Sequence, residues 1–80
     1  MDLKELTEFL VKSIVKDPDQ ISIRQIEDDE FITIEILVDK DIIGSVIGKK
    51  GNIANAIRTI VQAASYANGL KKVRINIDSF

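Results

Sequence analysis

Two glycines bracket two lysines in the segment Val46-Ile47-Gly48-Lys49-Lys50-Gly51-Asn52-Ile53, which is apolar at both ends. Because glycine lacks a Cβ, the backbone of this loop can turn sharply and approach a phosphate closely. The helix predicted after the loop directs free N–H groups and the positive end of its dipole at the same spot. Because the loop also contains two lysines, it is suited to binding a phosphodiester backbone rather than to catalysis.

The N-terminal residues predict a helix. Asp2 is suited to its N-cap, and Glu5, three residues later, completes the pattern of a capping box. Apolar residues recur at helical spacing and form one stripe: Leu3, Leu6, Phe9, Leu10 and Ile14. We expect Phe9 to belong to the core. The helix should end at the Asp-Pro-Asp run of residues 17–19, because a residue that precedes proline avoids the α conformation.

Alternation of apolar and polar residues predicts two strands that form a hairpin. Ile21 and Ile23 alternate with polar residues, and residues 32–38 alternate more clearly. The acidic run 27–30 lies between these strands. We interpret it as a solvated turn and not as a metal site, because no glycine-bearing ligand loop of the EF-hand type surrounds it.

The second half of the chain predicts two helices and a final strand. A short helix from Asp41 to Ile47 is stopped by Gly48, and a longer helix extends from about residue 52 to 68, where Asn-Gly supplies its C-cap. Residues 72–77 alternate again, and the apolar residues that should face inward are Val73, Ile75 and Ile77.

Together these elements predict an α+β fold. The element order is α-β-β-α-α-β, and the helical crossover allows the second and third strands to lie parallel and adjacent. The result is a two-layer sandwich in which three helices cover a three-stranded mixed sheet. We expect residues 1–80 to form a single domain.

Composition narrows the classes of function. The chain contains no cysteine and no histidine, which excludes disulfides, thiolate metal sites and Ser-His or Cys-His catalysis. We therefore expect no enzyme and no cofactor. No apolar run reaches the roughly 20 residues of a membrane span, and the first residues are acidic where a signal peptide would be basic. These features predict a cytoplasmic protein.

Charge is distributed unevenly along the chain, although the net charge is only −2. Residues 1–39 carry four basic and eleven acidic residues, whereas residues 40–74 carry seven basic residues and one acidic residue. This asymmetry favours a polyanion site in the second half of the chain. The alternative is that these charges merely cover solvent-exposed faces.

The element order, with a glycine-lysine loop between the two crossover helices, resembles a type II KH domain. The motif Ile43-Gly44-Ser45-Val46-Ile47-Gly48-Lys49-Lys50-Gly51 is similar to the family's V-I-G-x-x-G signature. With its continuation at residues 54–61 and its length, the chain resembles the small stand-alone bacterial KH proteins of the KhpA type over essentially all 80 residues. The resemblance implies a groove that holds about four unpaired nucleotides. It also implies a homodimer and a second KH-domain protein as partners.

The resemblance gives individual residues a role. Ile43 and Ile47 should offer apolar surface to the bases, and Gly44 should let the chain pack closely at the groove wall. The last strand should be the sheet edge beside the groove, with free backbone groups near Val73 that pair with a base. The predicted RNA-binding residues are Ile43, Gly44, Ile47, Gly48, Lys49, Lys50, Gly51, Asn52, Lys71, Lys72, Val73 and Arg74. Related chains often carry a basic residue where this chain has Ser45.

Two other interpretations of the loop are weaker. A Walker A loop needs one more residue between its glycines, and it needs Ser or Thr where Lys50 stands. A plain connector between helices does not need both glycines. None of the aromatic residues falls in the predicted groove, so stacking of bases on aromatic rings should not be the main mode of binding. Tyr66 lies on the polar side of the long helix and could be simply exposed.

The long helix carries a second apolar stripe. Its residues are Ala56, Ile60, Ala63 and Ala67. Together with the core stripe it is wider than the roughly 100° apolar face of an ordinary surface helix. The second stripe either packs against the N-terminal helix or forms a face for self-association or a partner.

The sequence thus predicts a single-stranded RNA-binding protein, which acts as a post-transcriptional regulator or RNA chaperone. The alternative is a protein–protein interaction module that pairs through the long helix and binds little RNA itself.

Overall fold

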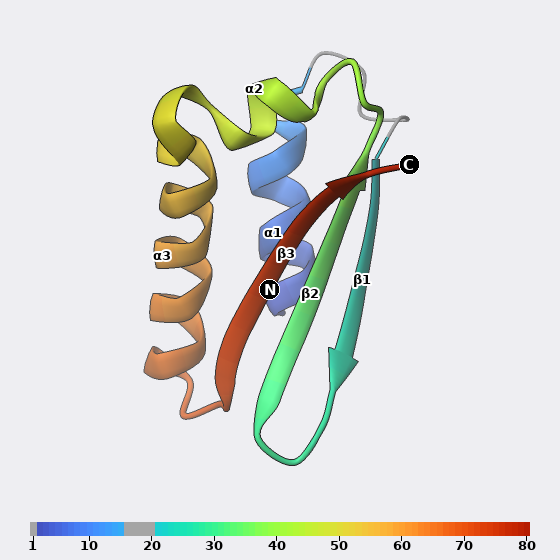
Figure 1. Ribbon diagram of the computed structural model, residues 1–80. Coiled ribbons are helices and arrows are strands. Elements are labelled where there is room, and N and C mark those ends of the chain that lie inside the picture. Colours follow the sequence, from blue (N-terminus) through green and yellow to red (C-terminus); the bar gives the residue numbers. More distant parts are fainter. Residues whose placement is uncertain (1, 16–20) are drawn as a thin grey trace.

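The computed structural model describes residues 2–15 and 21–80 (Figure 1). The elements are α1 (Leu3–Lys12), β1 (Ile21–Glu27), β2 (Phe31–Val38), α2 (Ile43–Ile47), the 3₁₀ turn η2 (Lys49–Gly51), α3 (Asn52–Ala67) and β3 (Lys72–Ser79). The predicted order of helices and strands is confirmed, with η2 added inside the glycine-lysine loop. The first helix ends at Lys12, with Ser13 as its C-cap, which is earlier than the end predicted at residues 17–19. Residues 17–19 themselves lie outside the described residues.

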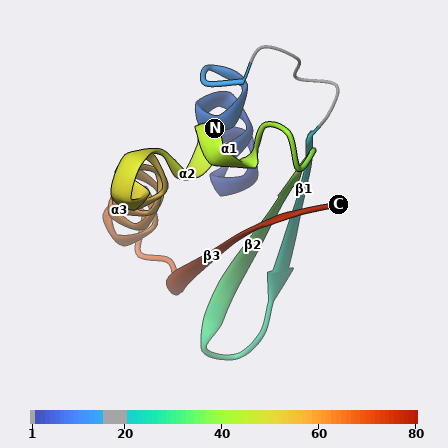
Figure 2. The ribbon, with the colours of Figure 1, turned by 45° about the horizontal axis from the view of Figure 1, so that its top comes forward.

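β2 is the central strand of a three-stranded mixed sheet. The strand order is β1-β2-β3, with β1 antiparallel and β3 parallel to β2. Every second residue of β2 is buried, beginning at Ile32 and ending at Val38, because only one face of the sheet is covered. Figures 1 and 2 show all three helices on that one side. The α+β sandwich predicted from the sequence is therefore confirmed.

The core lies between this sheet face and the helices. Its apolar residues are Leu3, Val11, Val15, Ile32, Ile34, Ile36, Val38, Val46, Ile57, Val61, Val73 and Ile75. Two hydroxyl groups are buried among them. Thr7 Oγ1 donates to the Leu3 carbonyl at 2.8 Å, and Ser65 Oγ donates to the Lys71 carbonyl at 2.6 Å. Both hydroxyls are therefore satisfied despite their burial.

The capping box at the start of α1 is present, but the core position predicted for Phe9 is wrong. Asp2 Oδ1 accepts from the Glu5 N–H, and the Asp2 N–H donates back to Glu5. Phe9 is 59% exposed. The buried row of α1 is centred on Thr7, and a residue two positions further lies about 200° around the helix. Phe9 therefore points away from the sheet.

The helix predicted from Asp41 begins later, at Ile43. Asp39 organises the turn before it. Asp39 Oδ1 accepts from the Asp41 N–H at 3.0 Å, and the Asp39 carbonyl accepts from the N–H groups of Ile42 and Ile43 at 2.9 and 3.1 Å. These bonds hold residues 39–42 in a turn rather than in a first helical turn.

The acidic run closes the β1–β2 hairpin, as predicted. Asp28 Oδ1 accepts from the N–H groups of Phe31 at 2.7 Å and of Glu30 at 2.8 Å. These hydrogen bonds, the Phe31 one first, favour the ionised carboxylate and lower the pKa of Asp28 below its ordinary value. The carboxylate of Asp28 therefore stabilises the turn.

We predict that Asp28→Asn lowers the free energy of unfolding at neutral pH. The pKa of Asp28 is lower in the folded than in the unfolded chain, so its stabilisation is present above the unfolded value and is lost as pH falls through the folded value. Urea unfolding of wild type and variant should therefore differ at pH ~7, and the difference should begin to shrink only below pH ~4 and vanish once pH is below the folded pKa. A difference that does not change with pH would contradict this assignment.

Candidate nucleic-acid interface

The glycine-lysine loop joins α2 to α3 at the end of the sheet where β2 ends (Figure 1). Its backbone enters the left-handed region at Gly48, Lys50 and Gly51, where φ is +77°, +57° and +75°. Glycine adopts this conformation without steric cost. Lys50 adopts it against a cost of roughly 1–2 kcal/mol. A lysine held in this way is a mark of a functional loop.

Gly48 is required for packing as well as for its backbone angle. Its N–H donates to the Gly44 carbonyl at 2.9 Å and ends α2, and its carbonyl accepts from the Gly51 N–H at 3.1 Å. A Cβ built on Gly48 would lie 2.6 Å from Ile53 Cγ1. The loop therefore packs directly on the first turn of α3.

Positive charge and free donors converge at this loop. No side chain caps the N-terminus of α3, whose N-cap is Gly51 and whose first residue, Asn52, is exposed. Lys49 and Lys50 are exposed, and neither takes part in the salt bridges found among residues 2–15 and 21–80. The helix dipole and two mobile ammonium groups thus act on the same space, which favours an anion there.

α2 places an apolar surface beside the loop. Val46 is fully buried, Ile43 is half-buried against the core, and Ile47 is 36% exposed. The predicted reason for Gly44 is wrong, because a Cβ built there would meet no atom within 4 Å. Gly44 leaves the surface of α2 open instead of allowing close packing within the protein.

β3 is the sheet edge beside α3, as predicted. The Phe80 N–H donates to the Val38 carbonyl at 3.0 Å, whereas the Val73 carbonyl accepts from Gln62 Nε2 at 3.3 Å. Backbone groups of successive strand residues point in alternate directions. Ile75 and Ile77 therefore share the outward direction of Val73. Because Gln62 already bonds the Val73 carbonyl, the open stretch of this edge lies at Ile75 and Ile77.

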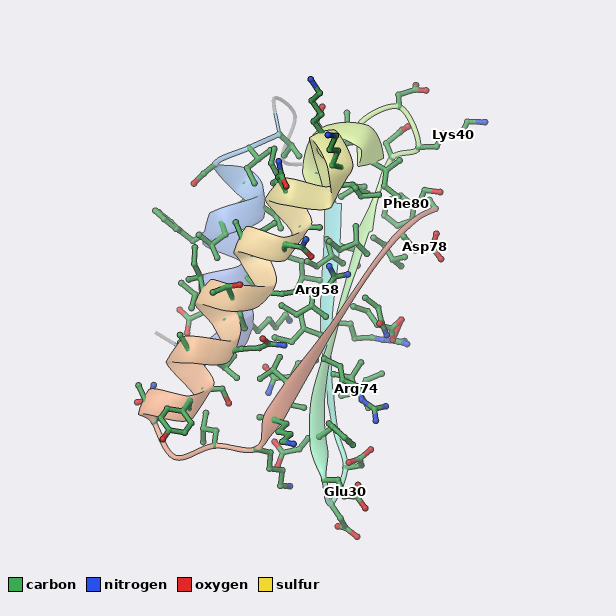
Figure 3. All side chains as sticks on the ribbon, turned by 60° about the vertical axis from the view of Figure 1, so that its left-hand side comes forward. Glu30, Lys40, Arg58, Arg74, Asp78 and Phe80 are labelled. Carbon is green, nitrogen blue, oxygen red and sulfur yellow. The ribbon has the colours of Figure 1, made fainter. Side chains whose placement is uncertain are left out.

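Lys71, Lys72 and Arg74 lie far from the loop. The strand register pairs Lys72 with Phe31 at the start of β2, whereas α2 follows the other end of β2. β2 is eight residues long, so its two ends lie about 23 Å apart. Figure 3 shows Arg74 on the half of β3 nearer to Glu30 of the hairpin, away from Lys40. These cations therefore lie at the opposite end of β3 from the loop. Their predicted contact with RNA stays a prediction.

Two of these cations contact the hairpin. Lys71 Nζ lies 2.8 Å from Glu27 Oε2 and donates to the Asp28 carbonyl at 2.7 Å. The Arg74 guanidinium lies 3.6 Å from the centroid of the Phe31 ring. Arg74 alternates with buried Val73, so it stands on the sheet face opposite the helices.

Arg58 is a basic residue that the predicted site omitted. It is half-buried on α3, and Figure 3 shows it between α3 and β3. Its Nη1 donates to Asn55 Oδ1 at 3.2 Å. Arg58 follows Gly51 by seven residues, or two helical turns, and this spacing in the sequence was a signal that both lie on one side of α3.

The KhpA/KhpB KH-domain family matches residues 4–77 of this sequence. The chain belongs to this family. The RNA-binding protein KhpA of Clostridium perfringens is 41% identical over 75 residues, which cover 94% of this chain and 99% of the relative. The RNA-binding protein KhpA of Aquifex aeolicus is 38% identical over 71 residues, which cover 89% of this chain and 90% of the relative. The KH assignment made from the motif is thereby confirmed.

Solved structures of Era share the fold. Aquifex aeolicus Era bound to GDP and aluminium fluoride superposes with a TM-score of 0.76 at 18% identity over 98% of this chain. Era in complex with MgGDPNP and nucleotides 1506–1542 of 16S ribosomal RNA superposes with a TM-score of 0.71 at 19% identity over 96% of this chain. The matched regions are 30% and 29% of the Era chains, so this KH chain corresponds to a minor part of each.

The second apolar stripe of α3 is uncovered in this KH structure. Ala56, Ile60, Ala63 and Ala67 are all exposed, and Ile60 is exposed to 45%. The interpretation that this stripe packs against α1 is therefore wrong. α3 contacts its neighbours instead through its buried row, which is Ala54, Ile57, Val61 and Ser65.

Two further observations concern other classes of site. Every helix in the described part of the chain is too short or too polar to cross a bilayer. Within the same ranges, no three side chains of the metal-ligating types His, Cys, Asp and Glu are grouped around a common point.

We predict different effects of alanine at Gly44, which lies within α2, and at Gly48, which is its C-cap. Gly48→Ala should lower the free energy of unfolding by about 2 kcal/mol or more, because of its positive φ and the contact with Ile53. Gly44→Ala should leave it unchanged or raise it by up to about 1 kcal/mol. Urea unfolding measures both. Equal effects of the two substitutions would contradict the described loop geometry.

Proposed function

We propose that this chain is a single-stranded RNA-binding protein whose working site is the loop at Gly48–Gly51. The observation that carries the proposal is the convergence of two unpaired, exposed lysines with the uncapped N-terminus of α3. The names of the KhpA relatives, and the solved complex of Era with ribosomal RNA, support it. We further propose that the chain is not an enzyme and that it acts in the cytoplasm.

Binding would begin at the loop. A phosphate group approaches the backbone at Gly48 and Gly51, and the ammonium groups of Lys49 and Lys50 neutralise it. Asn52 lies at the same helix end. The phosphate contacts position the strand without reading its sequence.

The bases would lie between α2 and the edge of β3. Ile43 and Ile47 supply apolar surface, while the outward backbone groups of Ile75 and Ile77 are available to base edges. Arg58 supplies a further donor from α3. Unpaired bases are required, because only they expose their pairing edges to such a groove. With few side-chain donors, the site should have loose sequence preference, which suits a post-transcriptional regulator or an RNA chaperone.

Removal of the two loop charges should weaken RNA binding. For Lys49→Gln/Lys50→Gln we predict a loss of at least tenfold in affinity for a single-stranded RNA, with the fold unchanged. The slope of log K against log salt concentration should become shallower by about 1.4, because each lost phosphate contact accounts for about 0.7. Fluorescence anisotropy of a labelled RNA at several salt concentrations measures both quantities.

The matched control is Lys4→Gln/Lys12→Gln. It changes the net charge equally but lies on α1. It should leave affinity and salt slope close to wild type. Equal losses in the two double variants would show that net charge, and not the loop, governs binding.

We also propose that α3 mediates self-association, and this is favoured by the exposed stripe Ala56, Ile60, Ala63 and Ala67. Three small residues around one isoleucine allow a second helix to approach closely. A homodimer, or a complex with a second KH-domain protein, would hold two loops near one RNA and raise avidity through effective concentration. A module that only pairs through α3 and binds no RNA is the alternative function.

Charge in this stripe should abolish self-association. Ile60→Lys is predicted to convert the dimer to monomer in sedimentation experiments, with the fold unchanged because Ile60 is 45% exposed. Leu70→Lys is the matched control, since Leu70 is 51% exposed and lies outside the stripe. A wild-type chain that sediments as a monomer at all concentrations would refute self-association through this stripe.

A further inference from the structure

An open pocket of about 380 Å³ lies between the end of α3 and the start of β3. It is lined by Gln62, Tyr66, Leu70, Lys71, Lys72 and Val73. Its volume lies within the range of small-ligand sites. Tyr66 follows Gly51 by fifteen residues, so the pocket lies about 22 Å along α3 from the loop. It is therefore separate from the phosphate site proposed above.

Packing in the core does not account for Tyr66. Its side chain is 88% exposed, and neighbouring Leu70 is 51% exposed. Tyr66 lies one helical turn after Gln62, whose amide is bonded to the Val73 carbonyl of the β3 edge. The tyrosine thus stands on the flank of α3 that faces this edge. An aromatic ring and a leucine exposed together at a pocket indicate a surface for a flat apolar group.

Positive charge borders the same pocket. Lys71 is fixed by its ion pair with Glu27 at 2.8 Å and by the Asp28 carbonyl. Lys72 is exposed and forms no ion pair within the described residues. An aromatic ring beside a free lysine is complementary to a nucleotide, which presents a flat base and a phosphate, and less so to a purely apolar side chain.

We infer that this pocket is a distal nucleotide subsite, in which a base stacks on Tyr66 and Lys72 contacts a phosphate. The inference rests on the proposed function, because the strand that reaches Tyr66 is the one held at the loop. Gln62 and Arg58 lie on α3 between the two points, so one helix flank connects them. The subsite is sequence-tolerant, because every base has a face that can stack.

The chain contains one tyrosine and no tryptophan, so its intrinsic fluorescence reports on Tyr66 alone. Unlabelled oligouridines of about four nucleotides, the length that a KH groove holds, and of about twice that length are titrated into wild type. Anisotropy of labelled versions of the same oligomers reports binding independently. We expect both to bind and only the longer one to quench Tyr66, after correction with free tyrosine amide.

The affinities of two Tyr66 variants also test whether this residue contacts only the longer oligomer. Tyr66→Ala should weaken binding of the longer oligomer at least about fivefold and leave binding of the shorter oligomer unchanged. Tyr66→Phe keeps the ring and should bind both like wild type. Because Tyr66 is exposed, both variants should fold like wild type, and circular dichroism of each variant checks this.

The outcomes separate this subsite from the function on which it rests. If both oligomers bind, depend on Lys49 and Lys50, and neither quenches Tyr66 nor responds to Tyr66→Ala, the subsite is refuted while the loop site stands. If neither oligomer binds, the proposed function fails and the subsite with it. Quenching by both lengths would place Tyr66 inside the primary groove and would also overturn a distal subsite.

Discussion

The parallel pairing of β2 with β3 is the constraint on which the rest of the structure depends. Two parallel neighbours require the chain to return along the whole length of the sheet before it enters the second strand. Here α3 runs back along the sheet, and α2 and the loop connect the end of β2 to the start of α3. The loop is therefore fixed at the end of the sheet where β2 finishes, and the start of β3 is fixed at the opposite end.

Within that crossover, the loop must satisfy packing and binding at once. Gly48 has to lack a side chain because Ile53 occupies the space that a Cβ would need. Lys50 is instead a residue that the left-handed conformation disfavours. A glycine at position 50 would relieve this strain but would remove a charge from the end of α3. The presence of lysine there is best explained by the charge, and the packing around Gly48 maintains the strained turn.

Most of the fold could be predicted because it depends on local patterns. The alternation of residues 32–38, the capping box at Asp2 and the Asn-Gly end of α3 each act over a few residues. Phe9 was misplaced because helical spacing alone does not locate the centre of an apolar stripe. That centre is Thr7, whose hydroxyl is satisfied by its own helix and so is buried without penalty.

The site was harder to predict than the fold, for a physical reason. The loop residues are contiguous, so the sequence places them together. Lys71, Lys72 and Arg74 were predicted to bind RNA from the last strand, but their distance from the loop depends on which end of β2 they pair with. The bond from Gln62 to Val73 likewise joins residues from two elements, and no local pattern encodes it.

The same topology explains why the acidic first half and the basic second half of the sequence do not form two separate surfaces of opposite charge. The acidic hairpin belongs to the first half of the sequence, yet it folds against the start of β3 and pairs with Lys71. The Arg74 guanidinium packs on the Phe31 ring. Its charge lowers the pKa of Asp28 further, although less than the two backbone hydrogen bonds do. Lys71 is thus compensated at the hairpin end, whereas Lys49, Lys50 and Lys72 form no ion pair within the described residues. Unbalanced positive charge is concentrated at the loop, so ionic attraction should anchor a polyanion there. Towards the acidic hairpin, Lys72 supplies a single free ammonium group, so most of any further gain in affinity there should come from stacking on the exposed ring of Tyr66.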